Sequence, residues 1–215
     1  MTADMTIRDK METFEGATIQ HGLLNNRIYL IKVGSAEPAA LCKKLEQLAR
    51  HNRYEKIVAK IPAPCGNAFL DAGYTQEAAI PGFYQGKTDA LFLAKYFSAD
   101  RQREDKADEY EHVLQVTEQK RQYPGSPSYD GFAMRPCDES DAEAMSEVYR
   151  TVFPSYPFPI DNPDYLRETM RTHIDYFGVT RKGSLIALSS AEMDLKEQNV
   201  EMTDFATLPA WRGRG

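Results

Sequence analysis

The residues with the clearest chemical potential lie at the C-terminal end of the sequence. Two carboxylates, Glu201 and Asp204, stand in a stretch of mixed apolar and polar residues, 200–208, that predicts a β-strand. After Pro209 the chain continues to Arg212-Gly213-Arg214-Gly215. Glycines let successive backbone N–H groups turn toward an anion, so a strand that feeds a glycine loop predicts a phosphate cradle. A plain surface turn is the alternative interpretation of this loop alone.

Composition narrows the class of protein. The 215 residues can form one large or two small domains, and 42% hydrophobic with 27% charged residues is ordinary for a soluble globular chain. A net charge of −6 argues against a nucleic-acid partner, because such domains usually carry a basic patch. The sequence holds neither an apolar run of about 20 residues nor a signal-peptide core at its start. We therefore predict a cytoplasmic protein without a membrane partner.

The cysteines and histidines give no sign of a metal site. Three scattered cysteines lack any Cys-x-x-Cys spacing, so neither zinc nor a disulfide framework is indicated. Cys42 stands on a helix face and is predicted to be a small buried hydrophobic residue. The four histidines are far apart, and we expect structural or exposed roles for them.

The first hundred residues predict a small α/β domain. Residues 1–16 are polar and predict an irregular lead-in, and a strand is expected at 28–33. Pro38 suits a first helical position, and the leucines that follow it recur at helical spacing. Further strands are predicted at 56–61 and within 74–97. Glu37, in the turn before the helix, would repel a pyrophosphate, so this half is not expected to bind a nucleotide cofactor there.

The middle of the chain predicts a linker and a boundary. Residues 98–123 are rich in charged side chains with a narrow apolar stripe, which favours a solvated helix. Pro124-Gly125-Ser126-Pro127 then breaks the chain. We predict an N-terminal domain over residues 1–100, a charged helical linker over 101–130 and a C-terminal domain over 131–215.

The C-terminal part predicts two helices and a run of strands. Asp138 and Asp141 form an acidic capping pair before a helix that continues to Val152. The proline-rich segment 153–159 cannot continue that helix, and a second one is predicted from Asn162-Pro163. A hairpin is expected around Lys182-Gly183. Because their spacing is odd, Glu201 and Asp204 should point to opposite faces of their strand.

These elements and motifs resemble the GNAT acetyltransferase superfamily. Its acyl-CoA loop has the signature Arg/Gln-x-x-Gly-x-Gly/Ala, of which residues 212–215 match the first four positions, and the order strand, helix, helix and three strands is similar to the first half of its fold. Over its whole length the chain resembles the beta-lysine N-acetyltransferase family. The segments that carry this resemblance are 20–22, 26–30, 56–63, 73–86 and 204–209.

The resemblance implies an α+β fold, in which a GNAT-like mixed sheet with flanking helices follows a smaller α/β domain similar to a degenerate half of the same fold. It implies an enzyme that transfers acetyl from acetyl-CoA to the side-chain amine of L-beta-lysine and so makes a compatible solute, with no metal. It also implies that the sequence stops within the acetyl-CoA loop. An acetyltransferase of lysine, a polyamine or another small amine, or an inactive truncated chain, is the alternative. An exposed strand edge makes a homodimer possible.

The resemblance also assigns site residues. A lysine-type amine has a pKa near 10.4, so about one molecule in a few thousand is neutral at pH 7 and the enzyme must remove a proton. Asp204 and Glu201 are the candidate bases, with Asp204 preferred, directly or through a water; binding of the substrate ammonium is its alternative role. The aromatic residues Phe153, Tyr156 and Phe158 are expected in the acceptor site, with core packing as the alternative. The residues expected to bind acetyl-CoA are Phe205, Ala206, Thr207, Leu208, Arg212, Gly213, Arg214 and Gly215.

Overall fold

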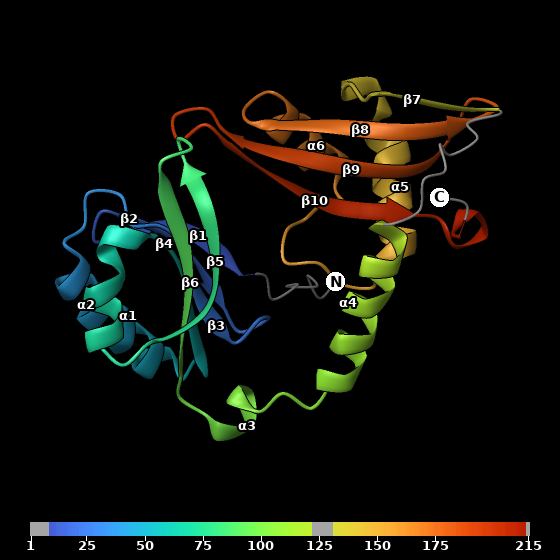
Figure 1. Cartoon of the computed structure of the whole chain (residues 1–215). Helices are drawn as coiled ribbons and strands as arrows, with labels where there is room; N and C mark the ends of the chain where they lie inside the picture. The colour runs from blue at the N-terminus through green and yellow to red at the C-terminus, as the bar shows by residue number, and fades with distance from the viewer. Residues whose placement is uncertain (1–8, 122–130, 214–215) are drawn as a thin grey trace, which may run out of the picture. The chain divides into compact units, whose positions relative to one another are not determined.

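The computed structural model of the chain describes residues 9–121 and 131–213 (Figure 1). Contacts divide the described residues into two compact units. The first comprises residues 9–79 and 91–121, and the second comprises 80–90 and 131–213. The domain boundaries proposed from the sequence stay a prediction.

The first unit is built on a mixed sheet with strands in the order β1-β2-β3-β4-β6-β5. Strands β1 to β3 are antiparallel neighbours, whereas β3 and β4 are parallel because helix α1 crosses between them. The mixed sheet with flanking helices is therefore confirmed. The strands are β1 (Lys10–Phe14), β2 (Ala17–Gly22), β3 (Arg27–Lys32), β4 (Lys56–Pro62), β5 (Thr75–Tyr84) and β6 (Thr88–Tyr96), and the helices are α1 (Pro38–Asn52), α2 (Gly66–Asp71), α3 (Ala99–Gln102) and α4 (Ala107–Arg121).

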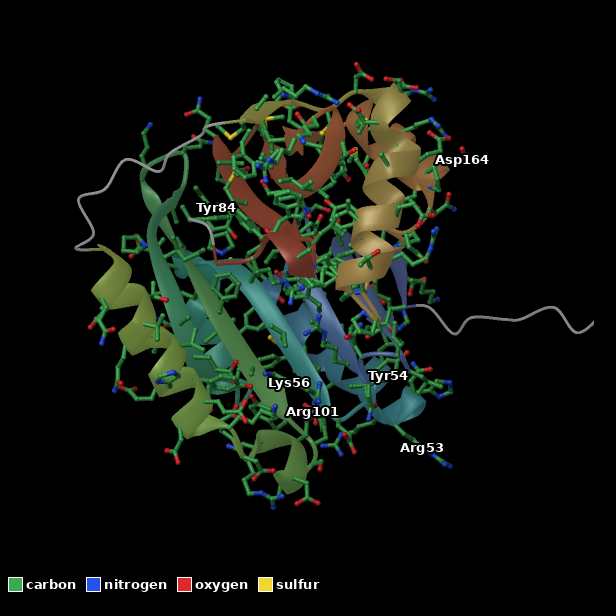
Figure 2. All side chains as sticks on the ribbon, turned by 90° about the vertical axis from the view of Figure 1, so that its right-hand side faces the viewer. Arg53, Tyr54, Lys56, Tyr84, Arg101 and Asp164 are labelled. Carbon is green, nitrogen blue, oxygen red and sulfur yellow. The ribbon has the colours of Figure 1, made fainter. Side chains whose placement is uncertain are left out.

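Helix α1 follows the sequence pattern closely. Glu37 is its N-cap residue: the carboxylate accepts hydrogen bonds from the N–H groups of Ala39 and Ala40 and so stabilises the start of the helix. Its apolar stripe, with Leu41 and Leu45, is buried in the core. The helix ends at Arg53, whose positive φ of 59° reverses the chain toward β4. Figure 2 labels Arg53 at this turn.

The prediction of an irregular segment over residues 1–16 was wrong for the part that the structure describes. Residues 10–14 form β1, which pairs with β2 through a two-residue turn at Glu15 and Gly16. Both turn residues have positive φ, 52° and 83°, as a tight hairpin requires. The signal was missed because Glu-Gly is a weaker hairpin pair than Asn-Gly. The two ring nitrogens of His21 on β2 form hydrogen bonds with Glu12 of β1 and with the phenol of Tyr54. Figure 2 also labels Tyr54.

The second unit carries a four-stranded antiparallel sheet in the order β10-β9-β8-β7. Helices α5 and α6 pack on one face of this sheet (Figure 1). Met145 and Tyr149 of α5, Leu166 of α6 and Tyr176 of β8 meet in its core. The elements are β7 (Phe132–Pro136), α5 (Ala142–Val152), α6 (Pro163–Met170), β8 (Ile174–Arg181), β9 (Ser184–Asp194) and β10 (Asn199–Thr207).

The predicted signals of this unit are confirmed. Asp138 and Asp141 form a reciprocal capping box immediately before α5. Asn162 caps α6, and Pro163 is its first residue. Asp164, labelled in Figure 2, lies exposed in the first turn of α6 and pairs with Arg167. The β8–β9 hairpin turns at Lys182-Gly183. Within the described ranges, no helix has the length and apolar character needed to cross a membrane.

Replacement of Leu166 by alanine tests the core of the second unit. The side chain is fully buried, so Leu166→Ala should lower the free energy of unfolding by about 2–5 kcal/mol. The matched control is Leu195→Ala, since Leu195 is 82% exposed, and its change should stay within about 0.5 kcal/mol. Urea unfolding followed by the fluorescence of the single tryptophan, Trp211, measures both. Equal losses in the two variants would contradict this core.

Candidate active site

A β-bulge in β10 creates the most unusual backbone in the second unit. Thr203 lies opposite Ser190 and Ala206 lies opposite Leu188, so three steps along β10 span two steps along β9. Asp204 occupies the bulge with a φ of 53°, in the left-handed region that aspartate tolerates better than most residues. The bulge therefore redirects one side chain of the strand.

The bulge corrects the prediction that Glu201 and Asp204 point to opposite faces. The extra residue breaks the alternation of the strand, and the Asp204 carboxylate accepts a hydrogen bond from Thr203, two residues beyond Glu201. Asp204 is 7% exposed and Ala206 is buried in the core under α5, whereas Phe205 is 67% exposed on the other face. Glu201, Thr203 and Asp204 thus share the helix-covered face.

Three hydroxyl groups from three different segments converge on the Asp204 carboxylate. Ser190 of β9 donates to Oδ2 at 2.8 Å, and Thr203 donates to Oδ1 at 2.8 Å. Tyr156, from the segment between α5 and α6, also donates its phenol proton to Oδ1. A buried carboxylate is costly unless it is hydrogen-bonded, and these donors meet that need.

Tyr156 lies in the proline-rich segment that the sequence proposed for the acceptor site. Its half-buried ring packs against Phe153, with centroids 5.1 Å apart, and both rings border the core together with Phe158. The three aromatic residues therefore pack, and Tyr156 in addition reaches Asp204. Burial first, and then its hydrogen bond to Asp204, raise the pKa of the Tyr156 phenol well above its usual range.

A second acidic position lies further along the same face. Glu201 is directly opposite Glu192 of β9 in the β-ladder. Tyr165 of α6 lies close to this part of the face: burial, and then the charges of Glu192 and Asp204, raise the pKa of its phenol to about 12. The helix-covered face therefore combines carboxylates and phenols, a suitable lining for a cationic amine.

The segment predicted to bind acetyl-CoA is partly described. Within the described residues β10 is paired only with β9, so Phe205, Ala206 and Thr207 lie on a sheet edge. Leu208 continues the ladder through its N–H bond to Ile186. The Arg212 side chain donates to the Thr207 carbonyl at 3.0 Å, and Gly213 has a φ of 73°. Arg214 and Gly215 lie outside the described residues.

Cysteine chemistry is disfavoured by burial. Burial raises the pKa of the Cys42 and Cys137 thiols to about 11, so both are protonated near neutral pH. Cys42 is 2% exposed and behaves as the small hydrophobic residue predicted for it. In the described part of the chain, no three or more histidine, cysteine or acidic residues are grouped as metal ligands.

The sequence did not identify Ser190, Thr203, Glu192 and Tyr165 as members of the site. Ser190 carried a usable signal, because it follows Ile186 and Leu188 at alternate positions on a buried strand face. A fully buried serine requires a hydrogen-bond partner. The other three residues give no such signal, since their role depends on strand register and on the bulge.

Comparison with known proteins found close relatives by sequence. A beta-lysine N(6)-acetyltransferase from Methanococcus maripaludis is 34% identical over 207 residues, which cover 96% of this chain and 75% of that protein. A protein of the same name from Methanosarcina mazei is 29% identical over 80% of the chain and 70% of its own length. The N-acetyltransferase YodP of Bacillus subtilis is 26% identical over 92% of the chain and 71% of its own length. No family model matches the chain.

Comparison with solved structures gives matches at low sequence identity. The C-terminal domain of a putative lysylphosphatidylglycerol synthetase from Agrobacterium fabrum matches 94% of this chain with a TM-score of 0.50 and 11% identity. The match spans 61% of that structure. A tandem GNAT protein of clavulanic acid biosynthesis matches 93% of this chain and 61% of its own, with a TM-score of 0.45 and 12% identity.

Removal of the Asp204 charge should lower the pKa of Tyr165. Burial, Glu192 and Asp204 together hold that pKa at about 12, so Asp204→Asn should shift it down while burial keeps it above its usual value. Tyrosinate absorbance across alkaline pH measures the shift, and Tyr165→Phe in each background identifies the signal. Circular dichroism over the same range checks that the chain stays folded. An unchanged titration would mean that Asp204 does not act on Tyr165.

Proposed function

The chain belongs to the beta-lysine N(6)-acetyltransferase family, and we propose that it transfers the acetyl group of acetyl-CoA to the side-chain amine of L-beta-lysine. The observation that carries this proposal is the buried Asp204 carboxylate at the bulge of β10, on a face lined by carboxylates and phenols. That face suits an amine that enters as a cation and leaves as an amide. The sequence relatives support the choice of acceptor.

The described residues fit acetyl-CoA as co-substrate. The edge of β10 offers backbone N–H and C=O groups at Phe205 to Thr207, which can pair with the amides of a pantetheine arm. Gly213 has positive φ and open space around its Cα, as a phosphate-binding turn requires. Acetyl-CoA supplies the activated thioester, and Arg212, Gly213, Arg214 and Gly215 are proposed to meet its pyrophosphate.

We assign proton removal to Asp204 in preference to Glu201. Asp204 lies at the bulge, beside the backbone proposed to hold the thioester, whereas Glu201 lies further back along the strand. Attack on a thioester requires a neutral amine, so a nearby base contributes about 10²- to 10⁴-fold to the rate. Phe153, which packs against Tyr156, and Phe158, which borders the core, are proposed to shape the acceptor side.

Glu201 and Glu192 are proposed to hold the second amine of the acceptor. Two strand residues, from Glu201 to Thr203, span about 7 Å. In extended beta-lysine, which is 3,6-diaminohexanoate, five covalent bonds place the two nitrogens about 6 Å apart. These two lengths are similar. If the 3-ammonium group binds to Glu201 and Glu192, the 6-amine can therefore reach the bulge at Asp204.

The proposed product fits an osmolyte. Beta-lysine carries two ammonium groups and one carboxylate, so its net charge is positive, and acetylation removes one positive charge. The product is a zwitterion without net charge, which can accumulate without a counterion. A cytoplasmic location and a homodimer stay predictions.

Incubation of the protein with acetyl-CoA and L-beta-lysine tests the proposed function. We expect stoichiometric release of CoA thiol, and mass spectrometry with fragmentation should place the acetyl group on N6. Asp204→Asn should lower kcat by about 10²- to 10⁴-fold. Lysine and putrescine serve as comparison acceptors. Faster transfer to either of them, or none to any amine, would contradict the assignment.

Substrate truncation tests the glutamate pair. Glu201→Gln and Glu192→Gln should each raise the KM for beta-lysine about tenfold, equivalent to about 1.4 kcal/mol. The matched control is 6-aminohexanoate, which is beta-lysine without its 3-amino group, and its KM should change little. If both substrates respond equally, the glutamates do not recognise the second amine.

A further inference from the structure

We propose that the phenol of Tyr156 carries the proton from the acceptor amine to Asp204, so that Tyr156 is a catalytic residue and Asp204 acts through it. This inference rests on the proposed function and adds the route of the proton to it. Its basis is the hydrogen bond from Tyr156 to Oδ1 of Asp204, together with the way the rest of that carboxylate is occupied.

Access to the carboxylate is the first argument. Asp204 is 7% exposed, and Ser190 already donates to Oδ2. On Oδ1, Thr203 and Tyr156 both donate. Tyr156 is half-buried and thus the more accessible of the two ends of the Tyr156–Asp204 pair. The proposal therefore places an approaching amine next to the phenol of Tyr156 rather than next to the carboxylate.

The protonation state of the phenol is the second argument. Burial and the bond to Asp204 raise the pKa of Tyr156, so the phenol is neutral at physiological pH and cannot act alone as a base. A phenol oxygen can accept one hydrogen bond while its own proton is donated elsewhere. Tyr156 can therefore take a proton only if it passes its own proton to Asp204 in the same event.

The proposed step balances in atoms and charge. The acceptor enters as an ammonium, and one of its protons moves to Oη of Tyr156 while the phenol proton moves to Oδ1 of Asp204. The neutral amine nitrogen that results forms a bond to the thioester carbon. The C–S bond then breaks, the thiolate takes the second proton from the nitrogen and leaves as a thiol, and Asp204 returns its proton to solvent. No oxidant, reductant or metal enters the balance.

The packing of Tyr156 suits such a relay. Its ring contacts Phe153, whose ring stacks on Tyr149 of α5 with centroids 6.1 Å apart. The buried face of helix α5 thereby helps to fix the direction of the phenol. Tyr149 also supplies a matched control. Its buried hydroxyl makes no hydrogen bond within the described residues, although the charge of Asp204 acts on it.

The test is the pH dependence of kcat/KM for the amine in wild type, Tyr156→Phe and Tyr149→Phe. With the relay, the enzyme accepts the ammonium form, so log kcat/KM should be nearly flat between pH 7 and 9. Without it, the rate must follow the neutral amine, which increases tenfold per pH unit below its pKa of about 10.4. Tyr156→Phe should therefore lose about 100-fold or more at pH 7 and gain a slope near one.

Controls separate the relay from a structural role. Tyr149→Phe removes a hydroxyl that makes no bond, and it should retain the flat profile with kcat/KM within about twofold. Ser190→Ala removes a different donor from Asp204, so it should lower the rate without changing the slope. Asp204→Asn should show the same slope as Tyr156→Phe. The tryptophan unfolding assay confirms that each variant is folded.

The outcomes distinguish the two proposals. If wild type acetylates the amine and Tyr156→Phe keeps both the rate and the flat profile, the relay is overturned while the proposed function stands. If Tyr156→Phe lowers the rate but keeps the flat profile, Tyr156 only orders the acceptor segment, and the relay is again overturned. If wild type transfers acetyl to no amine, both proposals fall.

Discussion

The buried carboxylate of Asp204 is the constraint on which the second unit depends. It lies in the left-handed region at a bulge, 7% exposed, and it accepts hydrogen bonds from Tyr156, Ser190 and Thr203. A buried charge with fewer partners would be strongly destabilising. The three donors come from the α5–α6 segment, β9 and β10, so one side chain connects the parts that form the proposed acceptor face.

The bulge at Asp204 affects both the stability of the second unit and the proposed reaction. The bulge that turns Asp204 inward also interrupts the ladder between Thr203 and Ala206, at the edge proposed to receive the acetyl donor. In the proposed reaction, one backbone irregularity thus places the base beside the site of the acetyl donor. Strain of this kind, held in place by hydrogen bonds, is common where a strand serves a reaction. In the proposal, Glu201, Glu192 and the phenols on the same face bind the positively charged acceptor.

Local sequence signals were sufficient for most elements of both units. Residues close together in the sequence predict four of these features: helix α1, the capping box at Asp138 and Asp141, the end of α5 at Val152 before the proline-rich segment, and the hairpin at Lys182-Gly183. The edge strand β1 was missed because the Glu15-Gly16 turn is atypical in sequence. Each of these outcomes depends on residues only a few positions apart.

The geometry of the candidate active site could be predicted from the sequence only in part, for a physical reason. The sequence identified Asp204 as the preferred carboxylate and Tyr156 as an acceptor-segment residue. It could not show that they touch, because they are 48 positions apart and meet only when α5 packs on the sheet. It also assigned Glu201 and Asp204 to opposite faces, since a bulge leaves no mark on residue spacing. Ser190 and Glu192 depend on strand register in the same way.

The most direct test of this account is a double-mutant cycle on kcat/KM with Tyr156→Phe, Asp204→Asn and the combined variant. Groups that act as one unit are strongly non-additive in their effects on rate. The account predicts that the double variant is about as slow as the slower single variant. Losses that multiply, so that the two effects add in free energy, would show that Tyr156 and Asp204 act independently and would contradict it.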